Sequence, residues 1–146
     1  MQNVLVGRHF GGRRRARGAA LAETERLRAT VGLVGRANER AQALPLADRK
    51  RLEMARALAT EPALLLLDEL LSGIRAAEAR ALMDLIREIR QRGTTIILIE
   101  HIMKAVMTLS DRIVVLHHGE KIADGPPEVV AAEPAVIQAY LGASRP

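Results

Sequence analysis

The stretch LLLLDE at residues 64–69 decides the fold class. Its apolar part continues from Ala63 to Leu67, a length typical of one strand that is buried on both faces of a parallel sheet. Two carboxylates, Asp68 and Glu69, follow directly. Because ligands of open α/β sheets bind at the carboxyl ends of the strands, both acids are candidates for chemistry, although a strand that simply ends in a polar turn is the alternative.

Adjacent carboxylates at such a position can divide the work between them. The first, Asp68, can hold Mg²⁺ directly or through water, and the second, Glu69, can orient or deprotonate an attacking water. From these residues alone, a metal-dependent hydrolytic site at the end of this strand is one interpretation, and a strand that simply ends in a polar turn is the other.

A helix and a second strand follow the acids. Residues 76–92 have the spacing of an amphipathic helix that stops at Gly93, and its inward residues are Leu82, Leu85, Ile86 and Ile89. Thr95–Ile99 reads as another buried strand. A strand, a helix and a strand in this order indicate a βαβ unit with parallel strands.

The second strand also ends in polar residues, Glu100 and His101. Since neighbouring parallel strands bring their carboxyl ends together, we expect His101 to lie beside Asp68 and Glu69. A histidine there can hydrogen-bond a terminal phosphate, whereas an isolated histidine is more often a solvated surface residue.

The remaining pattern is consistent with an α/β protein. Towards the N-terminus, residues 1–18 read as irregular, residues 19–43 as a helix with a looser connection, and residues 49–60 as a helix preceded by Pro45. Towards the C-terminus, we expect a helix at residues 103–109, two strands at 112–116 and 120–123 around a His117-His118-Gly119 turn, and two short helices near 127–132 and 134–141.

Composition excludes several classes of protein. The chain has 146 residues, 49% of them apolar, and only Phe10 and Tyr140 are aromatic. It has no cysteine, which excludes disulfides and thiolate metal sites. No apolar run approaches the roughly 18 residues of a membrane span, and the N-terminus does not read as a signal peptide. Two histidines at residues 117 and 118 are too few for a metal site and read as solvated.

The net charge of +5 is unevenly distributed, since residues 1–60 carry 13 Lys and Arg against 5 Asp and Glu. This basic half suits phosphate, acidic lipid or nucleic acid, or it is a solvated face. A nucleic-acid-binding role is the weaker hypothesis, because single-stranded bases usually stack on aromatic side chains.

Several motifs resemble those of ABC-transporter ATPases, in the same order and over roughly residues 44–125. Residues 64–69 resemble the Walker B strand, Ser72 and Gly73 the start of the D-loop, and His101 the switch histidine. The run at residues 55–62 matches the usual approach to Walker B. The family's signature sequence corresponds to Leu44, Pro45, Leu46, Ala47 and Asp48.

The resemblance implies a partial P-loop NTPase fold, with the end of a helical subdomain, a parallel-sheet core, a C-terminal β-hairpin and short helices. It also implies ATP and Mg²⁺ as ligands, Glu69 as general base, and Asp68 at the metal. In this family the signature helix offers its N-terminus to a nucleotide on the opposite subunit of a head-to-tail dimer. Permease subunits, and through them a substrate-binding protein, would hold such an ATPase on the cytoplasmic face of the membrane.

The two ends of the chain are similar to one subfamily, the branched-chain amino-acid importers. Residues 3–9 (NVLVGRH) resemble the stretch after their Q-loop, and residues 136–142 (VIQAYLG) resemble their C-terminal tail. The resemblance divides the chain into a helical-subdomain remainder at 1–60, an ATPase core at 61–125 and a tail at 126–146.

The sequence departs from the family's pattern in several places. The generic signature is Leu-Ser-Gly-Gly-Gln, so Ala47 and Asp48 replace a glycine and a glutamine. Leu70 stands where proline usually follows the glutamate, and Arg75 where many D-loops carry aspartate. These changes weaken the expected phosphate contacts, because glycine permits the closest backbone approach.

The phosphate-binding loop is missing from the sequence. Residues 7–14 (GRHFGGRR) have two glycines at the Walker A spacing but lack its Lys and Ser/Thr, so we interpret them as a chance match. Gln2 does not replace the Q-loop glutamine. We therefore expect the chain to begin inside the helical subdomain, and two functions stay open: part of an energy-coupling ATPase, or a module that docks on partners without hydrolysing ATP.

Overall fold

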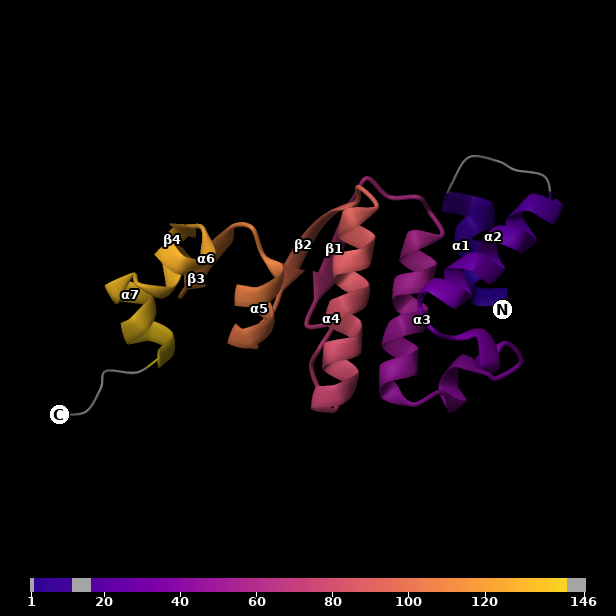
Figure 1. Ribbon diagram of the computed structural model, residues 1–146, viewed down its shortest axis with the longest axis horizontal. Helices are drawn as coiled ribbons and strands as arrows, with labels where there is room; N and C mark the ends of the chain where they lie inside the picture. The colour runs from indigo at the N-terminus through magenta and orange to yellow at the C-terminus, as the bar shows by residue number, and fades with distance from the viewer. Residues whose placement is uncertain (1, 12–16, 142–146) are drawn as a thin grey trace. The chain divides into compact units, whose positions relative to one another are not determined.

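The computed structural model describes residues 2–11 and 17–141 of the chain. These residues form two compact units, one ending at Ile99 and the other beginning at Glu100 (Figure 1). Each unit is described by itself. None of the described helices combines the length and the apolar character that crossing a membrane requires.

The first unit contains four helices and two strands, and the second contains three helices and two strands among the described residues. In chain order they are α1 (Gln2–Gly11), α2 (Arg17–Thr30), α3 (Leu46–Leu58), β1 (Leu64–Asp68), α4 (Ala76–Gln91), β2 (Thr95–Ile99), α5 (Met103–Leu109), β3 (Ile113–His117), β4 (Glu120–Gly125), α6 (Pro127–Ala131) and α7 (Pro134–Val136). Short 3-10 turns lie at Val34–Arg36 and Ala41–Ala43, and a π-helical turn follows α7 at Ile137–Leu141.

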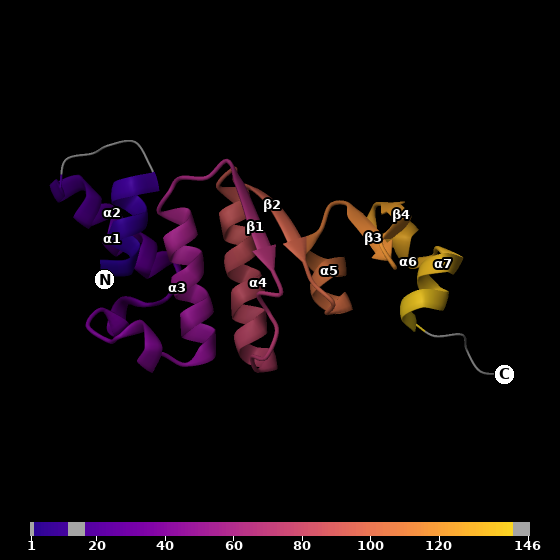
Figure 2. The same cartoon turned by 180° about the vertical axis from the view of Figure 1, so that it is seen from behind.

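The predicted βαβ unit is confirmed. Strands β1 and β2 pair in parallel, with Leu64 opposite Thr95 and Asp68 opposite Ile99. Helix α4 connects them and covers one face of the pair, as the opposite views of Figures 1 and 2 show. Its four predicted inward residues are all buried, together with Leu65 and Leu67 of β1. Gly93 ends the connection with a φ of 95°, as its predicted role as the stop requires.

The prediction that β1 and β2 are buried on both faces is wrong. The face turned away from α4 carries exposed apolar side chains: Leu64 (48%), Leu66 (66%), Ile97 (48%) and Ile99 (59%). A strand is buried on both faces only when a layer packs on each side. The described part of this unit supplies one such layer, α4.

The prediction that residues 1–18 are irregular is also wrong where the structure describes them. Residues 2–11 form α1, which packs against α2 and α3, and Val4 is completely buried. Gly7 allows this packing, because a Cβ at that position would lie only 2.8 Å from the carbonyl oxygen of Arg56 in α3. Close helix packing therefore outweighs the low helix propensity of this glycine-rich segment.

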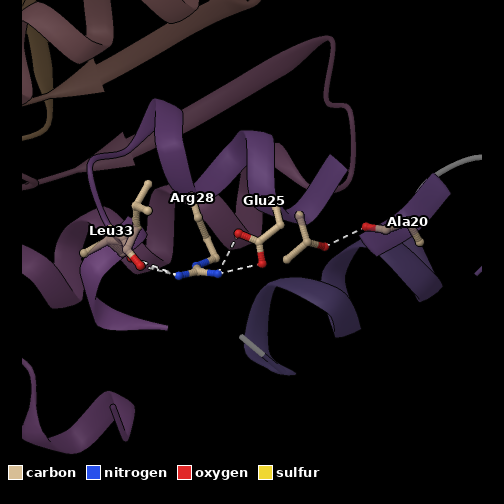
Figure 3. Close-up of polar contacts among 6 residues, drawn as sticks. Ala20, Glu25, Arg28 and Leu33 are labelled. Atoms are coloured by element: carbon tan, nitrogen blue, oxygen red, sulfur yellow. Dashed lines mark hydrogen bonds and ion pairs between the residues drawn. The ribbon is translucent and has the colours of Figure 1, made fainter. Parts of the chain in front are cut away.

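A buried arginine fixes the connection after α2 (Figure 3). The Arg28 side chain donates from one nitrogen to both carboxylate oxygens of Glu25, at 2.7 and 2.8 Å. Its other terminal nitrogen donates to the carbonyl oxygens of Leu33 (3.4 Å) and Val34 (2.6 Å). Within α2, the hydroxyl of the buried Thr24 donates a hydrogen bond to the Ala20 carbonyl oxygen at 2.8 Å. The bonds of Arg28 to Leu33 and Val34 satisfy backbone carbonyls just after the helix ends.

The second unit is built around the predicted C-terminal hairpin. Strands β3 and β4 pair antiparallel, with a bulge between Val115 and Leu116, and His118-Gly119 forms the turn. Ile113, Val130 and Val136 form the centre of a small apolar core between the hairpin and the short helices. The Tyr140 hydroxyl donates to the Leu116 carbonyl at 2.8 Å and ties the C-terminal turn to β3.

Candidate functional site

Asp68 and Glu69 lie at the carboxyl end of the β1–β2 pair, where the sequence predicts them. Asp68 is the last residue of β1 and pairs with Ile99, the last residue of β2. Both acidic residues are exposed. The Glu69 backbone N–H donates to the carbonyl oxygen of Ile99 at 2.9 Å, so the hydrogen bonding between the two segments continues one residue beyond the strand.

Glu69 has a left-handed backbone conformation, with a φ of 46°. A residue with a side chain rarely adopts this conformation, and such residues are concentrated at functional sites. Its carbonyl oxygen accepts a hydrogen bond from the backbone N–H of Ser72 at 3.2 Å and another from the Lys50 Nζ at 2.9 Å. The backbone of the candidate general base is thus fixed on both sides of its Cα.

Two leucines anchor the turn that follows. Leu70 and Leu71 are 6% and 2% exposed, so their side chains hold the turn against the core. Leu70 occupies the position at which the ABC-ATPase pattern has proline. Burial at this position constrains the turn through side-chain packing, whereas proline would do so through its fixed φ.

The turn meets the N-terminal end of α3 at Gly73. This glycine has a φ of 75°, and a Cβ built on it would lie 3.2 Å from the Leu46 Cδ2 atom. The D-loop glycine predicted from the sequence is therefore adjacent to the segment predicted as the signature. Arg75 follows at the N-terminus of α4, where its backbone N–H donates to the Glu78 carboxylate at 2.9 Å.

The five predicted signature residues lie at the start of α3, and Pro45 is the residue that precedes the helix. Leu44 and Ala47 are buried, while Pro45 and Leu46 are exposed. Asp48 lies in the first turn, and its carboxylate is 3.2 Å from the Arg36 Nε. A helix N-terminus favours an anion, and the ion pair with Arg36 reduces the repulsion that Asp48 would exert on it.

His101 is exposed and belongs to the second unit. Its expected position beside Asp68 and Glu69 therefore stays a prediction. The rings of His117 and His118 have centroids 4.2 Å apart on the hairpin. Among the described residues no group of three or more His, Asp or Glu side chains could hold a metal ion by itself.

The two carboxylates fit a magnesium ion that a nucleotide helps to bind. Mg²⁺ is commonly held by one or two carboxylates, several waters and the phosphates of the substrate, with no complete protein cage. Asp68 and Glu69, exposed and adjacent at the end of a sheet, match that donor set.

The part of the Walker A-like segment that the structure describes is helical. Residues 7–11 belong to α1, and residues 12–14 lie outside the described residues. A phosphate-binding loop surrounds phosphates with successive backbone N–H groups, whereas helical residues use theirs within the helix. The helix therefore agrees with the interpretation of residues 7–14 as a chance match.

Lys50 and Arg36 are two site residues that the sequence does not predict. Their partners, Glu69 and Asp48, lie 19 and 12 residues away in the chain and on different elements. Helical and strand periodicity identify residues that share an element. They give no signal for a contact across a turn that tertiary packing brings into place.

Comparison with known proteins identifies several relatives. The family described as branched-chain amino acid ATP-binding cassette transporter matches residues 120–145. The LivG proteins of Escherichia coli K12 and Salmonella typhimurium, described as high-affinity branched-chain amino acid transport ATP-binding proteins, are 41% identical over 97% of this chain and 61% of their own length. BraF of Pseudomonas aeruginosa is 44% identical over 77% of this chain and 44% of its own length.

Solved structures agree with these relatives. MJ1267, an ATP-binding cassette of an ABC transporter, matches with a TM-score of 0.81 and 23% identity over 95% of this chain and 61% of that protein. CbiO1 from Clostridium perfringens, part of the ABC transporter complex cbiONQ, matches with a TM-score of 0.80 and 26% identity over 94% of this chain and 54% of that protein.

By fold and sequence, then, the chain is related to the ATP-binding proteins of ABC transporters, and it has part of their P-loop NTPase fold. Within that class, it is related to the proteins of branched-chain amino acid transport. The chain spans about three fifths of the length of the LivG relatives that it matches.

Proposed function

We propose that this chain supplies the hydrolytic part of an energy-coupling ATPase in an importer of branched-chain amino acids. The observation that carries the proposal is the parallel register of β1 and β2, which ends with Asp68 opposite Ile99 and holds Glu69 one residue beyond the sheet. The names of the LivG and BraF relatives support the substrate class.

In this proposal the two carboxylates have different roles. Asp68 would hold Mg²⁺, directly or through a water, and the bound ion would stabilise the charge on the phosphates of ATP. Glu69 accepts a proton from the attacking water or orients it, and His101 hydrogen-bonds the terminal phosphate. The backbone N–H of Ser72 donates to the Glu69 carbonyl oxygen within the turn.

The start of α3 is proposed to face a nucleotide that is held by a second ATPase subunit. Leu44, Pro45, Leu46, Ala47 and Asp48 form this segment, and Ser72 and Gly73 form the D-loop beside it. The proposed regions are the helical-subdomain remainder (1–60), the ATPase core (61–125) and the tail (126–146). Permease subunits would be the membrane partners, on the cytoplasmic side.

Supplying the missing loop tests this function. The chain is fused behind the N-terminal part of Escherichia coli LivG, where the ABC-ATPase resemblance implies a phosphate-binding loop. We expect Mg²⁺-dependent ATP hydrolysis by the fusion, and we expect Glu69→Gln to reduce kcat by roughly 10²-fold or more, because it removes a general base.

Glu128→Gln is the matched control, because Glu128 is an exposed glutamate on α6 outside the proposed site. It should leave kcat unchanged. A fusion that hydrolyses ATP equally well with Glu69→Gln would contradict the assignment of Glu69.

A second candidate function follows from the missing loop. The 146-residue sequence contains no Walker A motif, and the second proposal is that this polypeptide by itself docks on partner subunits without hydrolysing ATP. Binding of the chain to a permease subunit without any ATP turnover in the assembled complex would favour this alternative.

A further inference from the structure

We propose that Lys50 is a positioning residue for the candidate general base, setting the backbone conformation of Glu69 from the start of α3. The inference rests on the proposed function and adds a residue to its site. It starts from one hydrogen bond, from the Lys50 Nζ to the Glu69 carbonyl oxygen at 2.9 Å.

Glu69 needs such support because of its backbone. Its φ of 46° is unfavourable for a residue with a side chain, and a strained conformation persists only where the surroundings hold it. The N–H on one side donates to Ile99 of β2, and the carbonyl on the other side accepts from Ser72 within the turn. The hydrogen bond from Lys50 reaches the Glu69 carbonyl from a separate helix, α3.

Two residues of α3 contact the same turn. The Lys50 Nζ donates to the carbonyl oxygen of Glu69, the first residue of the turn. The Leu46 side chain lies beside Gly73, at the end of the turn. Residues 46 and 50 are four apart, so they lie on the same face of the helix. One face of α3 therefore holds the turn at both ends, and a displacement of the helix would displace the backbone of the general base.

The chemical character of Lys50 suits this task. Its ammonium group donates to a backbone carbonyl and leaves the Glu69 carboxylate to the attacking water. Lys50→Arg keeps a charged donor at this position, whereas Lys50→Met keeps the aliphatic stem and removes the donor. Arg56→Met is a matched control, because Arg56 is an exposed cation at the other end of α3.

The first test measures amide hydrogen exchange in the complete 146-residue chain. Lys50→Met should accelerate exchange at the Glu69 and Ser72 amides by roughly two- to tenfold, as expected for the loss of one ordinary hydrogen bond. Lys50→Arg should restore most of the protection, and Arg56→Met should have no effect there. Amides in the middle of α4 serve as the reference for global stability.

The second test uses the ATP-hydrolysing fusion with LivG. Lys50→Met should lower kcat several-fold with little change in the KM for Mg-ATP, Lys50→Arg should recover most of the loss, and Arg56→Met should match the wild type. If Lys50→Met leaves either the local exchange or kcat unchanged, Lys50 does not position Glu69. A fusion that is insensitive to Glu69→Gln would instead refute the proposed function, while the exchange test would still stand.

Discussion

At the residue scale, Arg28 shows how one buried cation can organise a connection. The residue is 5% exposed, and its guanidinium donates to the carbonyl oxygens of Leu33 and Val34 while it pairs with Glu25. Buried polar groups that lose their partners are costly, because they have already given up their contacts with water.

We therefore expect Arg28→Met to lower the free energy of unfolding by about 2 kcal/mol, since it removes the Arg28 hydrogen bonds to the Leu33 and Val34 carbonyls and the ion pair with a half-exposed glutamate. Urea denaturation of the wild type and of the Arg28→Met variant measures the difference in the free energy of unfolding. Arg26→Met, which alters a side chain that is 81% exposed, should change it by less than about 0.5 kcal/mol. Equal effects of the two substitutions would show that the Arg28 bonds contribute little.

Some residues of the candidate site can be predicted from the sequence alone, and others cannot. Asp68 and Glu69 were predictable, because a short apolar run marks the end of its own strand and acids directly after it need no knowledge of the rest of the fold. Lys50 was not, because its contact depends on how α3 packs beside the turn. The place of His101 relative to the two acids stays a prediction.

At the element scale, the approach of α1 to α3 depends on Gly7. A Cβ there would meet the backbone carbonyl oxygen of Arg56 at 2.8 Å, and a backbone atom cannot rotate away as a side chain can. Among the described glycines, Gly35 offers the opposite case, because a Cβ there would have nothing within 4 Å.

Gly7→Ala should destabilise the first unit by about 1–2 kcal/mol, since overpacking exceeds the gain of roughly 1 kcal/mol in helix propensity. Gly35→Ala should be neutral or slightly stabilising. Thermal melts followed by circular dichroism compare the two variants. A Gly7→Ala chain that melts at or above the wild-type temperature would contradict the close packing of α1 on α3.

The hairpin carries a pH-dependent contact. Hydrogen bonds from Arg112 and then from Lys121 lower the pKa of Asp124 from its usual 3.8 to about 2. A lowered pKa means that the folded state favours the carboxylate, so this stabilisation is complete above pH 3.8 and disappears as the pH falls towards 2.

Asp124→Asn removes the carboxylate that titrates. The variant should therefore lack the loss of stability that this group causes in the wild type as the pH falls from 3.8 towards 2. Melting temperatures of the two chains, measured between pH 5 and pH 2 at low salt, provide the comparison. The wild type should lose its advantage over the variant as the pH falls. Parallel curves for the two chains would contradict the role of the Arg112–Asp124 pair.

Elements with strong periodicity were predictable, and those fixed by packing were not. The bounds of α4 and β2 follow from an amphipathic repeat, a stop glycine and a β-branched run. Helix α1 was not predicted, because its glycines and few apolar residues favour no regular structure by themselves. It becomes helical where α2 and α3 provide a surface to pack on. The apolar runs of β1 and β2 alone do not predict the exposed faces of these strands, because an apolar run does not reveal which layers are present to cover it.

At the scale of the whole molecule, the exposed sheet face has a consequence for solution behaviour. Leu66 and Ile97 are 66% and 48% exposed on neighbouring strands, and both strands have an edge that no described strand pairs with. Apolar patches and open edges favour association between chains.

The purified chain should therefore self-associate in a concentration-dependent way, as sedimentation velocity would detect. Leu66→Lys should weaken the association by placing a charge on this face, and Val34→Lys, at a position that is 58% exposed away from the sheet, should not. A wild-type chain that stays monomeric and melts cooperatively at high concentration would contradict this prediction.

The central claim is that this chain carries the metal and water side of an ATPase site without the phosphate side. Phosphoryl transfer needs the β and γ phosphates, Mg²⁺ and the attacking water to be positioned together. We propose Asp68 for the metal, Glu69 for the water and His101 for the terminal phosphate, and the given sequence has no Walker A motif with its lysine and Ser/Thr. A dimer of two such chains would not supply them either.

Steady-state ATP hydrolysis by the purified 146-residue chain, with and without Mg²⁺, tests this claim most directly. We expect no Mg²⁺-dependent turnover above background, and we expect Glu69→Gln to change nothing measurable. Turnover by the chain alone that Glu69→Gln abolishes would contradict the account, because it would mean that the site needs no Walker A loop.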